Sequence, residues 1–485
     1  MSTPLHYRSA NQLAAAIQAK EISSVELLQH FLGRIERHNP KLNAIIWMDA
    51  ERALARAAEA DAALTRGENW GALHGVPMSL KESYQVAGSP TTWGDPALKD
   101  NVTETTAIGA QRLLDAGAVF FAKTNVPIHL ADWQSYNEIY GTTNNPWDLN
   151  RSPGGSSGGS AAALAAGLTG IEAGSDIGAS IRNPAHYCGV FGHKPTFGAI
   201  PSRGQSMPGT FAASDISVVG PMARSAADLE LAFDAMAGPD LLDDSGWRLD
   251  LPDAPQKSLK DFRVAVKLTD PNSEVDQAYA DQMQGLVEKL AAAGATVNDN
   301  AHPDLDSTRL YEVYVMLLRA ATSSRLSDDD AAHWHDVATK LGAEDASYLA
   351  RMARANTLSH RDWLRLNNER HALRFKFAEF FQDWDILLCP AAASAAFPHD
   401  QAGERHDRTI TINGHPVPTT DQLFWAGFSG VVFLPSTVGP AGIQPDGLPV
   451  GYQAIAGHLR DKTAIRFAQC VEREIGGFVA PKGWD

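Results

Sequence analysis

The chain has 485 residues, of which 44% are apolar and 20% charged, with 40 Gly and 27 Pro. This composition is typical of a soluble globular protein, long enough for two or three domains of ordinary size. The formal net charge of −16 disfavours non-specific binding to nucleic-acid phosphates or anionic lipid, so we expect neither nucleic acid nor membrane among its partners.

Cysteine usage and the start of the chain bear on the compartment. The three cysteines, Cys188, Cys389 and Cys470, are widely spaced and include no C-x-x-C pair, so neither a disulfide framework nor a zinc cluster is expected. Residues 1–20 lack the apolar segment of a secretory signal, and no uncharged apolar run of about 18 residues occurs. We therefore expect a cytoplasmic protein.

The first 70 residues are expected to be helical. Ser23 and Glu26 have the spacing of a capping box, and apolar residues follow at helical period until Asn39-Pro40, which is expected to end the helix. From Gly71 the pattern changes to short apolar runs separated by Gly and Pro. The expected elements of this half are helices at 49–66 and 107–116 and strands at 76–80 and 118–122.

The stretch 144–209 is dense in Gly and Ser around a helix of small residues at 160–168, and small residues allow close approach of backbone or ligand. Residues 240–260 are acidic and are expected to form a surface connection. The later elements are expected to be strands at 262–266, 295–297, 386–388, 431–434 and 450–454 and helices at 275–293, within 307–381 and at 461–475. Alternating strands and helices favour an α/β sheet with parallel strands. No internal repeat indicates a solenoid or propeller.

Several common catalytic and metal-binding motifs are absent or incomplete. No P-loop or H-E-x-x-H occurs, and His333-x-His335 has no third ligand nearby, so a surface or packing role is expected and neither metal nor cofactor is predicted. Gly154-Gly155-Ser156-Ser157-Gly158 matches the G-x-S-x-G of a nucleophile elbow. However, an elbow needs a preceding strand, and residues 145–153 have the composition of a loop.

Two further features indicate acyl-transfer chemistry. The turn at 174–182 contains Ser180 among small residues, where backbone N–H groups could converge on an anion. Lys81 ends an apolar run, where burial would favour the neutral amine and make it a base. Each feature has a plainer interpretation, because a lysine after a strand commonly reaches solvent and a serine commonly caps a helix.

Taken together and in order, these segments resemble the amidase signature family. The resemblance spans roughly residues 10–475 and is weakest between about 240 and 385. The motifs that carry it lie at 122–127, 153–160, 174–184, 188–195, 219–225 and 446–453. It implies an α/β fold with a large central mixed β-sheet flanked by helices on both faces. The whole chain, 1–485, would form one domain, with N-terminal helices (1–70), a catalytic core (71–235), a strand-helix-strand unit (261–300), a helical substrate-pocket region (307–381) and strands completing the sheet before a C-terminal helix (385–475).

The family uses a Ser–cis-Ser–Lys triad, and the matching positions are Ser180 as nucleophile, Ser156 as bridging serine and Lys81 as base. The resemblance also implies a cis peptide bond between Gly155 and Ser156. Lys123 is a rival candidate for the base, but it lies in a segment that the family uses structurally. In the implied oxyanion hole the developing charge is held by backbone N–H groups, those of Ile177, Gly178, Ala179 and Ser180.

The sequence departs from the family pattern in two places. Ala179 stands where Gly is commoner, which would strain the backbone if φ is positive there. Ile128-His129 stands where an acidic residue often follows the Asn-x-Pro motif. Neither departure removes a catalytic group, but both bear on the shape of the pocket.

The expected function is hydrolysis of a small or medium carboxylic amide by water, with esters or carbamates as side substrates. Alternatives are the glutaminase A subunit of a tRNA-dependent amidotransferase and an inactive binding protein on the same fold. Trp133, Phe424 and Trp425 are candidates for the substrate pocket, although aromatic residues at such spacing also suit a core. A homodimer is left open.

Overall fold

The computed structural model describes residues 3–485. Across this range no helix has the length and apolar character needed to cross a membrane. The α-helices are α1 Ala10–Gln18, α2 Ser24–Leu42, α3 Ala50–Thr65, α4 Ile108–Asp115, α5 Gly158–Ala165, α6 Arg182–Cys188, α7 Ala226–Met236, α8 Gln277–Ala292, α9 Ser307–Thr322, α10 Asp328–Leu341, α11 Tyr348–Asn356, α12 His360–Asp383, α13 Phe424–Gly430 and α14 Asp461–Glu474.

The strands are β1 Ile45–Met48, β2 Pro77–Lys81, β3 Val119–Thr124, β4 Tyr136–Asn137, β5 Gly141–Thr142, β6 Glu172–Asp176, β7 Phe191–Lys194, β8 Val218–Ala223, β9 Arg263–Val266, β10 Thr296–Asn298, β11 Ile386–Pro390, β12 Thr409–Ile412, β13 His415–Pro418, β14 Ser436–Ile443 and β15 Pro449–Ile455. Two short 3₁₀ helices matter for the site, η5 Ser323–Arg325 and η6 Arg405–Asp407. Most expected elements are therefore present within a few residues of their predicted limits.

An eight-stranded sheet forms the centre of the molecule, in the order β10-β9-β11-β15-β14-β7-β8-β6. Only β10, β9 and β11 pair in parallel, and the other neighbours are antiparallel, so the sheet is mixed, as the family resemblance implies. The all-parallel arrangement that strand-helix alternation favours is thus limited to one edge. A three-stranded sheet, β1-β3-β2, continues the other edge through a single bridge between Met78 and Ile171.

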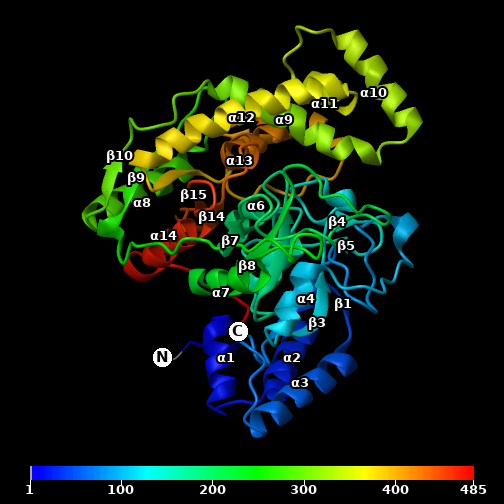
Figure 1. Cartoon of the computed structure of the whole chain (residues 1–485), viewed down its shortest axis with the longest axis vertical. Coiled ribbons are helices and arrows are strands. Elements are labelled where there is room, and N and C mark those ends of the chain that lie inside the picture. Colours follow the sequence, from blue (N-terminus) through cyan, green and yellow to red (C-terminus); the bar gives the residue numbers. More distant parts are fainter. Residues whose placement is uncertain (1–2) are drawn as a thin grey trace.

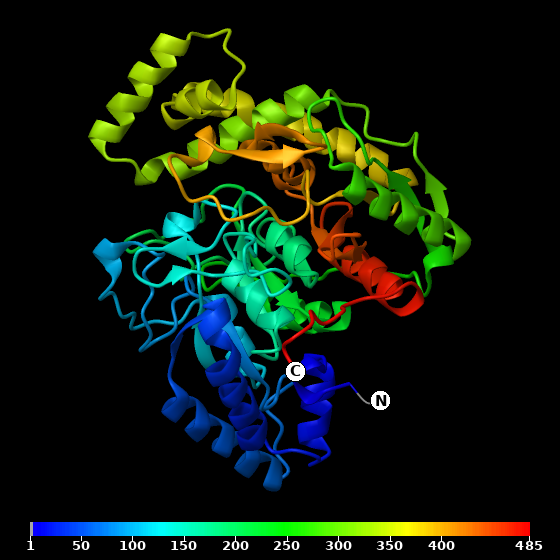
Figure 2. The same ribbon diagram turned by 180° about the vertical axis from the view of Figure 1, so that it is seen from behind.

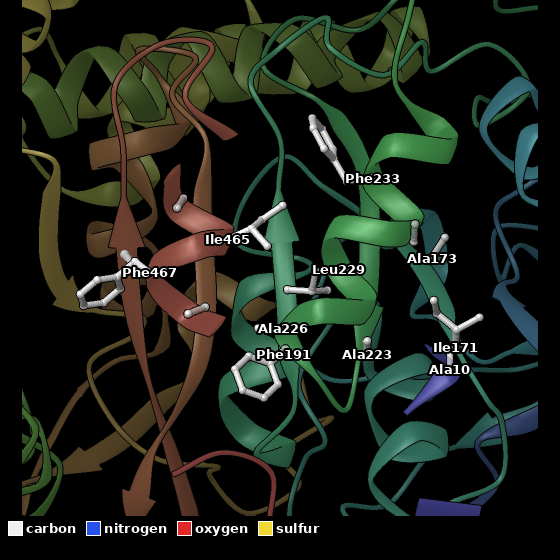
Figure 3. Close-up of a cluster of buried hydrophobic side chains, with 14 of the residues drawn as sticks. Ala10, Ile171, Ala173, Phe191, Ala223, Ala226, Leu229, Phe233, Ile465 and Phe467 are labelled. Carbon is white, nitrogen blue, oxygen red and sulfur yellow. The ribbon is translucent and has the colours of Figure 1, made fainter. Parts of the chain in front are cut away.

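Helices cover both faces of the eight-stranded sheet because side chains alternate along each strand. On β8, Ala223 belongs to a hydrophobic cluster with α7 and α14, whereas its neighbour Met222 belongs to a cluster with α5 and α6. Figure 3 shows Leu229 of α7 and Ile465 of α14 within the first cluster. Helices α9–α12 lie together at one end of the molecule, and α1–α3 lie at the opposite end (Figures 1 and 2).

Three local expectations are wrong. Residues 1–70 were expected to be helical, but they include the strand β1, which pairs antiparallel with β3. Helix α2 has the predicted capping box at Ser23 but continues past Pro40 to Leu42. Its end is fixed by Asn43, which is left-handed at φ +52°, and by the Asn39 side chain, which accepts the N–H groups of the next two residues.

The predicted strand at 431–434 is instead a turn that follows α13, and β14 begins only at Ser436. Every residue of α13 is buried, so no polar face interrupts the apolar run and its period gives no helical signal. Gly427 and Gly430 of this helix lie directly against the ring of Tyr314 on α9. The helix is therefore a product of tertiary packing.

Candidate active site

A cavity of about 560 Å³ lies between the catalytic core predicted from the sequence and the helical region. Ser156, Gly178 and Ser180 line one side, and Leu318 and Arg319 of α9 line another. The first set comes from the Gly/Ser-rich segment and the turn after β6. The structure therefore brings the two predicted serines to one solvent-accessible space.

Lys81 is the last residue of β2 and is fully buried, so its ammonium group does not reach solvent. Its Nζ donates to Ser156 Oγ at 2.7 Å and to Ser175 Oγ at 3.0 Å. Burial lowers the pKa of Lys81 to about 7, although the charges of Asp176, Glu172 and Glu82 oppose this shift. Near neutral pH a large share of Lys81 is consequently the neutral amine.

Ser156 follows a cis peptide bond from Gly155, as the family resemblance implies. The segment before it, 145–153, is a loop, so the strand of a nucleophile elbow is missing there as expected. The neighbouring N–H of Ser157 donates to the Ser180 carbonyl at 3.1 Å, which ties the two serine segments together. A side chain on Gly159 would overlap the backbone of Asn125, which explains the small residues here.

Asp176 shapes the turn that carries Ser180. Its carboxylate accepts the N–H groups of Ala179 and Ile181, each at 3.0 Å, and binds the Arg182 guanidinium through Nε and Nη2 at 3.0 and 2.8 Å. Burial alone would raise the pKa of Asp176, but Arg182 holds that pKa at about 2. The buried charge is thus fully paired, which gives the turn a single well-defined geometry.

This geometry changes the expected set of oxyanion donors. The N–H of Ala179 is already bound to Asp176, whereas those of Ile177, Gly178 and Ser180 have no acceptor within residues 3–485. Ala179 has φ +72°, so its backbone lies in the left-handed region that favours glycine. Three N–H groups, and not four, are available to a ligand in the cavity.

Lys123 is also fully buried, but its surroundings differ from those of Lys81. Its Nζ donates to the carbonyls of Glu82 and Pro90, each at 3.1 Å, to the carbonyl of Tyr84, and to Thr91 Oγ1 at 3.2 Å. None of these partners lines the cavity. The surroundings of Lys123 are those of a structural cross-link between loop segments.

Of the three aromatic pocket candidates, only Trp133 lines the cavity. Its Nε1 donates to the Gly178 carbonyl at 2.9 Å, which places the indole beside the oxyanion turn. Phe424 and Trp425 were expected there as well, but both belong to the hydrophobic core around α13 and pack against Phe428. An aromatic run on a buried helix directs most of its rings into the core.

Sequence reasoning did not single out Ser175, Asp176, Arg182 or Gln205. The first three lie inside the recognised serine turn, and an Asp and an Arg flanking the candidate nucleophile Ser180 were an available signal. Gln205 lies far along the chain, and its Nε2 donates to Ser175 Oγ at 3.0 Å and to Ser83 Oγ at 2.9 Å. Only the fold brings Gln205 next to Ser175, whose hydroxyl also contacts Lys81. No cluster of three or more metal-ligating side chains occurs within 3–485.

Comparison with known proteins gives consistent matches over nearly the whole chain. The family model described as Amidase matches residues 26–465. An acylamidase of Rhodococcus erythropolis is 33% identical and covers 96% of this chain and 94% of its own length. The A subunit of the glutamyl-tRNA(Gln) amidotransferase of Gloeothece citriformis is 30% identical, covering 96% and 97%.

Among solved structures, a bacterial aryl acylamidase described as belonging to the amidase signature enzymes matches with a TM-score of 0.81 at 24% identity, covering 98% of this chain and 97% of its own. At that identity the likeness shows the fold. The family model and the two relatives cover both sides of the cavity and the sheet between them. On these grounds the chain belongs to the amidase signature family of hydrolases.

Proposed function

We propose that this chain is an amidase that hydrolyses the C–N bond of a small or medium carboxylic amide through a seryl acyl-enzyme. In this proposal Ser180 is the nucleophile, Ser156 relays protons and Lys81 is the base. The observation that carries it is the 2.7 Å contact between Lys81 Nζ and Ser156 Oγ beside a cavity that Ser180 also lines. The acylamidase relative supports the same reaction type.

The first half-reaction begins with neutral Lys81. Lys81 Nζ takes the proton of Ser156 Oγ, Ser156 Oγ takes the proton of Ser180 Oγ, and Ser180 Oγ forms a bond to the amide carbon. The carbonyl π electrons move to oxygen, and the N–H groups of Ile177, Gly178 and Ser180 bind the resulting oxyanion. When the tetrahedral intermediate collapses, the C–N bond breaks and the nitrogen takes a proton from Ser156, which recovers one from Lys81.

The second half-reaction reverses this relay. Water replaces the amine, gives its proton through Ser156 to Lys81, and attacks the ester carbon of acylated Ser180. Collapse breaks the bond to Ser180 Oγ, which regains a proton, and releases the carboxylic acid. Lys81 returns to the neutral form, so the cycle consumes only amide and water.

The proposal is tested by measuring amide turnover by the purified chain and by Ser180→Ala. We expect the wild type to hydrolyse a panel of aryl and alkyl amides and the variant to lose at least about 1000-fold in kcat while keeping its circular dichroism spectrum. A reactive ester should leave an acyl group on wild-type Ser180, visible by mass spectrometry. Equal turnover by both proteins would overturn the assignment of the nucleophile.

The amidotransferase relative makes glutaminase activity the second candidate function. A glutaminase of that kind releases ammonia from L-glutamine and works with a partner, whereas a stand-alone amidase acts on amides by itself. Turnover of glutamine with no turnover of other amides would favour the second candidate. An inactive binding protein would turn over neither substrate and would bind amides equally well with Ala at position 180.

A further inference from the structure

The charges around the cavity are unevenly paired. Three carboxylates line it, and two of them are bound by arginines: Arg408 Nη1 lies 2.7 Å from Asp132, and Arg370 Nη1 lies 2.8 Å from Asp215. The third, Asp330, is exposed in the first turn of α10. The carboxylates inside the cavity therefore contribute little unpaired negative charge.

Most arginines that line the cavity, in contrast, are not paired with a carboxylate within residues 3–485. Arg203 is paired with Asp240, but Arg319, Arg325 and Arg405 have no carboxylate oxygen within 4.0 Å among the residues that the structure describes. His129, the only histidine in the lining of this cavity as described, is paired with Asp95. A chain with a net charge of −16 thus places three unpaired guanidinium groups around the cavity of its active site.

Two of these guanidinium groups share one neutral partner. Arg319 Nε donates to Tyr348 Oη at 2.8 Å, and Arg405 Nη2 reaches the same oxygen at 3.5 Å. The Nε of Arg405 is buried and has no acceptor in residues 3–485. Burial would raise the pKa of Tyr348, but Arg319 and Arg405 bring it below its usual value, as expected of a positive potential. Two guanidinium groups held close together, one of them with a buried N–H that has no acceptor, destabilise the protein unless an anion binds to them.

The position of this pair relates it to the reaction. The Arg405 guanidinium lies 5.1 Å from the centre of the Trp133 ring, and Trp133 donates to the carbonyl of Gly178 in the oxyanion turn. One indole ring therefore separates Arg405 from the turn that would hold the reacting carbonyl. Arg325 lies further out, exposed, with its guanidinium 5.0 Å from the centre of the Trp93 ring.

We infer that Arg319 and Arg405, with Arg325 nearer the solvent, form an anion-binding subsite, and that the substrate is an amide carrying a carboxylate away from the scissile bond. Planar guanidinium groups bind carboxylates through paired, charge-assisted hydrogen bonds. Arg319 and Arg405 both line the cavity, where a ligand carboxylate would meet their guanidinium groups. This inference rests on the proposed function for the reaction and on the unpaired arginines for the substrate class.

The test compares matched amides of equal length. Succinic, glutaric and adipic acid monoamides carry a terminal carboxylate where butanamide, pentanamide and hexanamide carry a methyl group, and all six release ammonia. For at least one pair we expect kcat/KM to favour the carboxylate by about 10- to 100-fold, the range of hydrogen bonds to charged groups. The preference should shrink as added salt screens the charges.

Arg319→Gln and Arg405→Gln should each reduce that preference about tenfold, because kcat/KM should fall more for the carboxylate than for the neutral amide of the same pair. Arg361→Gln is the matched control, because Arg361 is an exposed arginine of α12 away from the cavity and should change neither value. Equal kcat/KM within every pair, or a preference that survives both variants, would overturn the subsite.

Binding separates failure of the subsite from failure of the proposed reaction. Calorimetry with Ser180→Ala should show tighter binding of the monoamide than of the neutral amide in the pair that turnover favours, and Arg405→Gln should remove the difference. If the wild type hydrolyses neutral amides but binds both kinds equally, the subsite is wrong and the amidase proposal stands. If it binds the monoamides selectively but hydrolyses nothing, the subsite stands and the amidase proposal is wrong.

Discussion

The two sides of the cavity are built in opposite ways. On the side of the catalytic core, Lys81, Ser156 and Ser180 are at most 6% exposed and are surrounded by short polar contacts. On the helical side, Arg319 and Arg405 are half-buried and share a single tyrosine hydroxyl. A proton relay needs a dry, fixed geometry, whereas a substrate subsite needs charge that a ligand can still reach.

This contrast separates the chemistry from the choice of substrate. On the core side, backbone segments pack directly against each other, as at Gly159, and Asp176 and Arg182 form a buried ion pair. Few substitutions at these positions would preserve the structure. The helical side presents side chains from α9, η5 and η6 that can change without disturbing the sheet. Relatives with different substrates can accordingly share the first side and differ in the second.

The largest expected effect distinguishes the two buried lysines of the core. Lys81→Ala should lower kcat/KM for amides by about 1000-fold, with a smaller loss for activated esters, whose leaving groups need less proton donation. Lys123→Met should instead destabilise the fold by roughly 2–4 kcal/mol, because it removes a buried donor that four oxygens of the loop segments share. Steady-state kinetics and thermal unfolding together measure the difference. Equal losses of activity in both variants, each fully folded, would contradict the assigned base.

The pH dependence should follow the same lysine. The pKa of Lys81 is lowered to about 7, and the neutral amine, which is the active form in the proposed relay, predominates above that pH. We therefore expect kcat/KM for amides to rise with pH through about 7 and to approach a tenfold fall for each unit well below it, or about 50-fold between pH 7 and 5. The residual activity of Lys81→Ala should be flat over this window. A wild-type profile that is flat there would break the link to Lys81.

A smaller effect concerns the backbone of the oxyanion turn. Ala179 has φ +72°, so Ala179→Gly relieves a strain of about 1–2 kcal/mol that offsets the added freedom of the unfolded chain. Its stability should stay within about 0.5 kcal/mol of wild type. Ala185→Gly, in the nearby buried helix α6, should cost about 2 kcal/mol through lost helix propensity and lost methyl burial. Thermal midpoints that fall equally in both variants would show that position 179 is unstrained.

The smallest expected effect lies on the helical side. Tyr348→Phe removes the acceptor that positions Arg319 and Arg405, so KM for a carboxylate-bearing amide should rise about three- to tenfold. The kcat for the neutral amide of the same length should not change. Tyr452→Phe is the control, since its buried hydroxyl makes no hydrogen bond within the described residues. A comparable fall in kcat for both amides would place Tyr348 in the chemistry instead.

Much of the core side was readable from the sequence. The Gly/Ser-rich segment and the serine turn indicated Ser156 and Ser180, which line one cavity in the structure, and the resemblance to the family implied the cis bond before Ser156. A local motif determines local backbone geometry, so such features are visible without the fold. The capping box at Ser23 was visible for the same reason.

The helical side was not readable in this way. Arg319 and Arg405 are 86 residues apart in the sequence, and neither stands in a motif. Phe424 and Trp425 had the aromatic character of pocket residues, but α13 is buried and both side chains pack in the hydrophobic core. Whether an arginine is paired with a carboxylate depends on segments brought together only by folding.

By itself the sequence determined the family, the mixed α/β fold and the residues of the proposed triad, because these rest on contiguous motifs with specific backbone requirements. The tertiary structure decided three things that the motifs left open. It engaged the N–H of Ala179 with Asp176, buried Lys81 deeply enough to lower its pKa to about 7, and left three arginines unpaired at the cavity. The burial of a side chain and the pairing of its charge depend on segments that are far apart in the sequence, so no local sequence pattern predicts them.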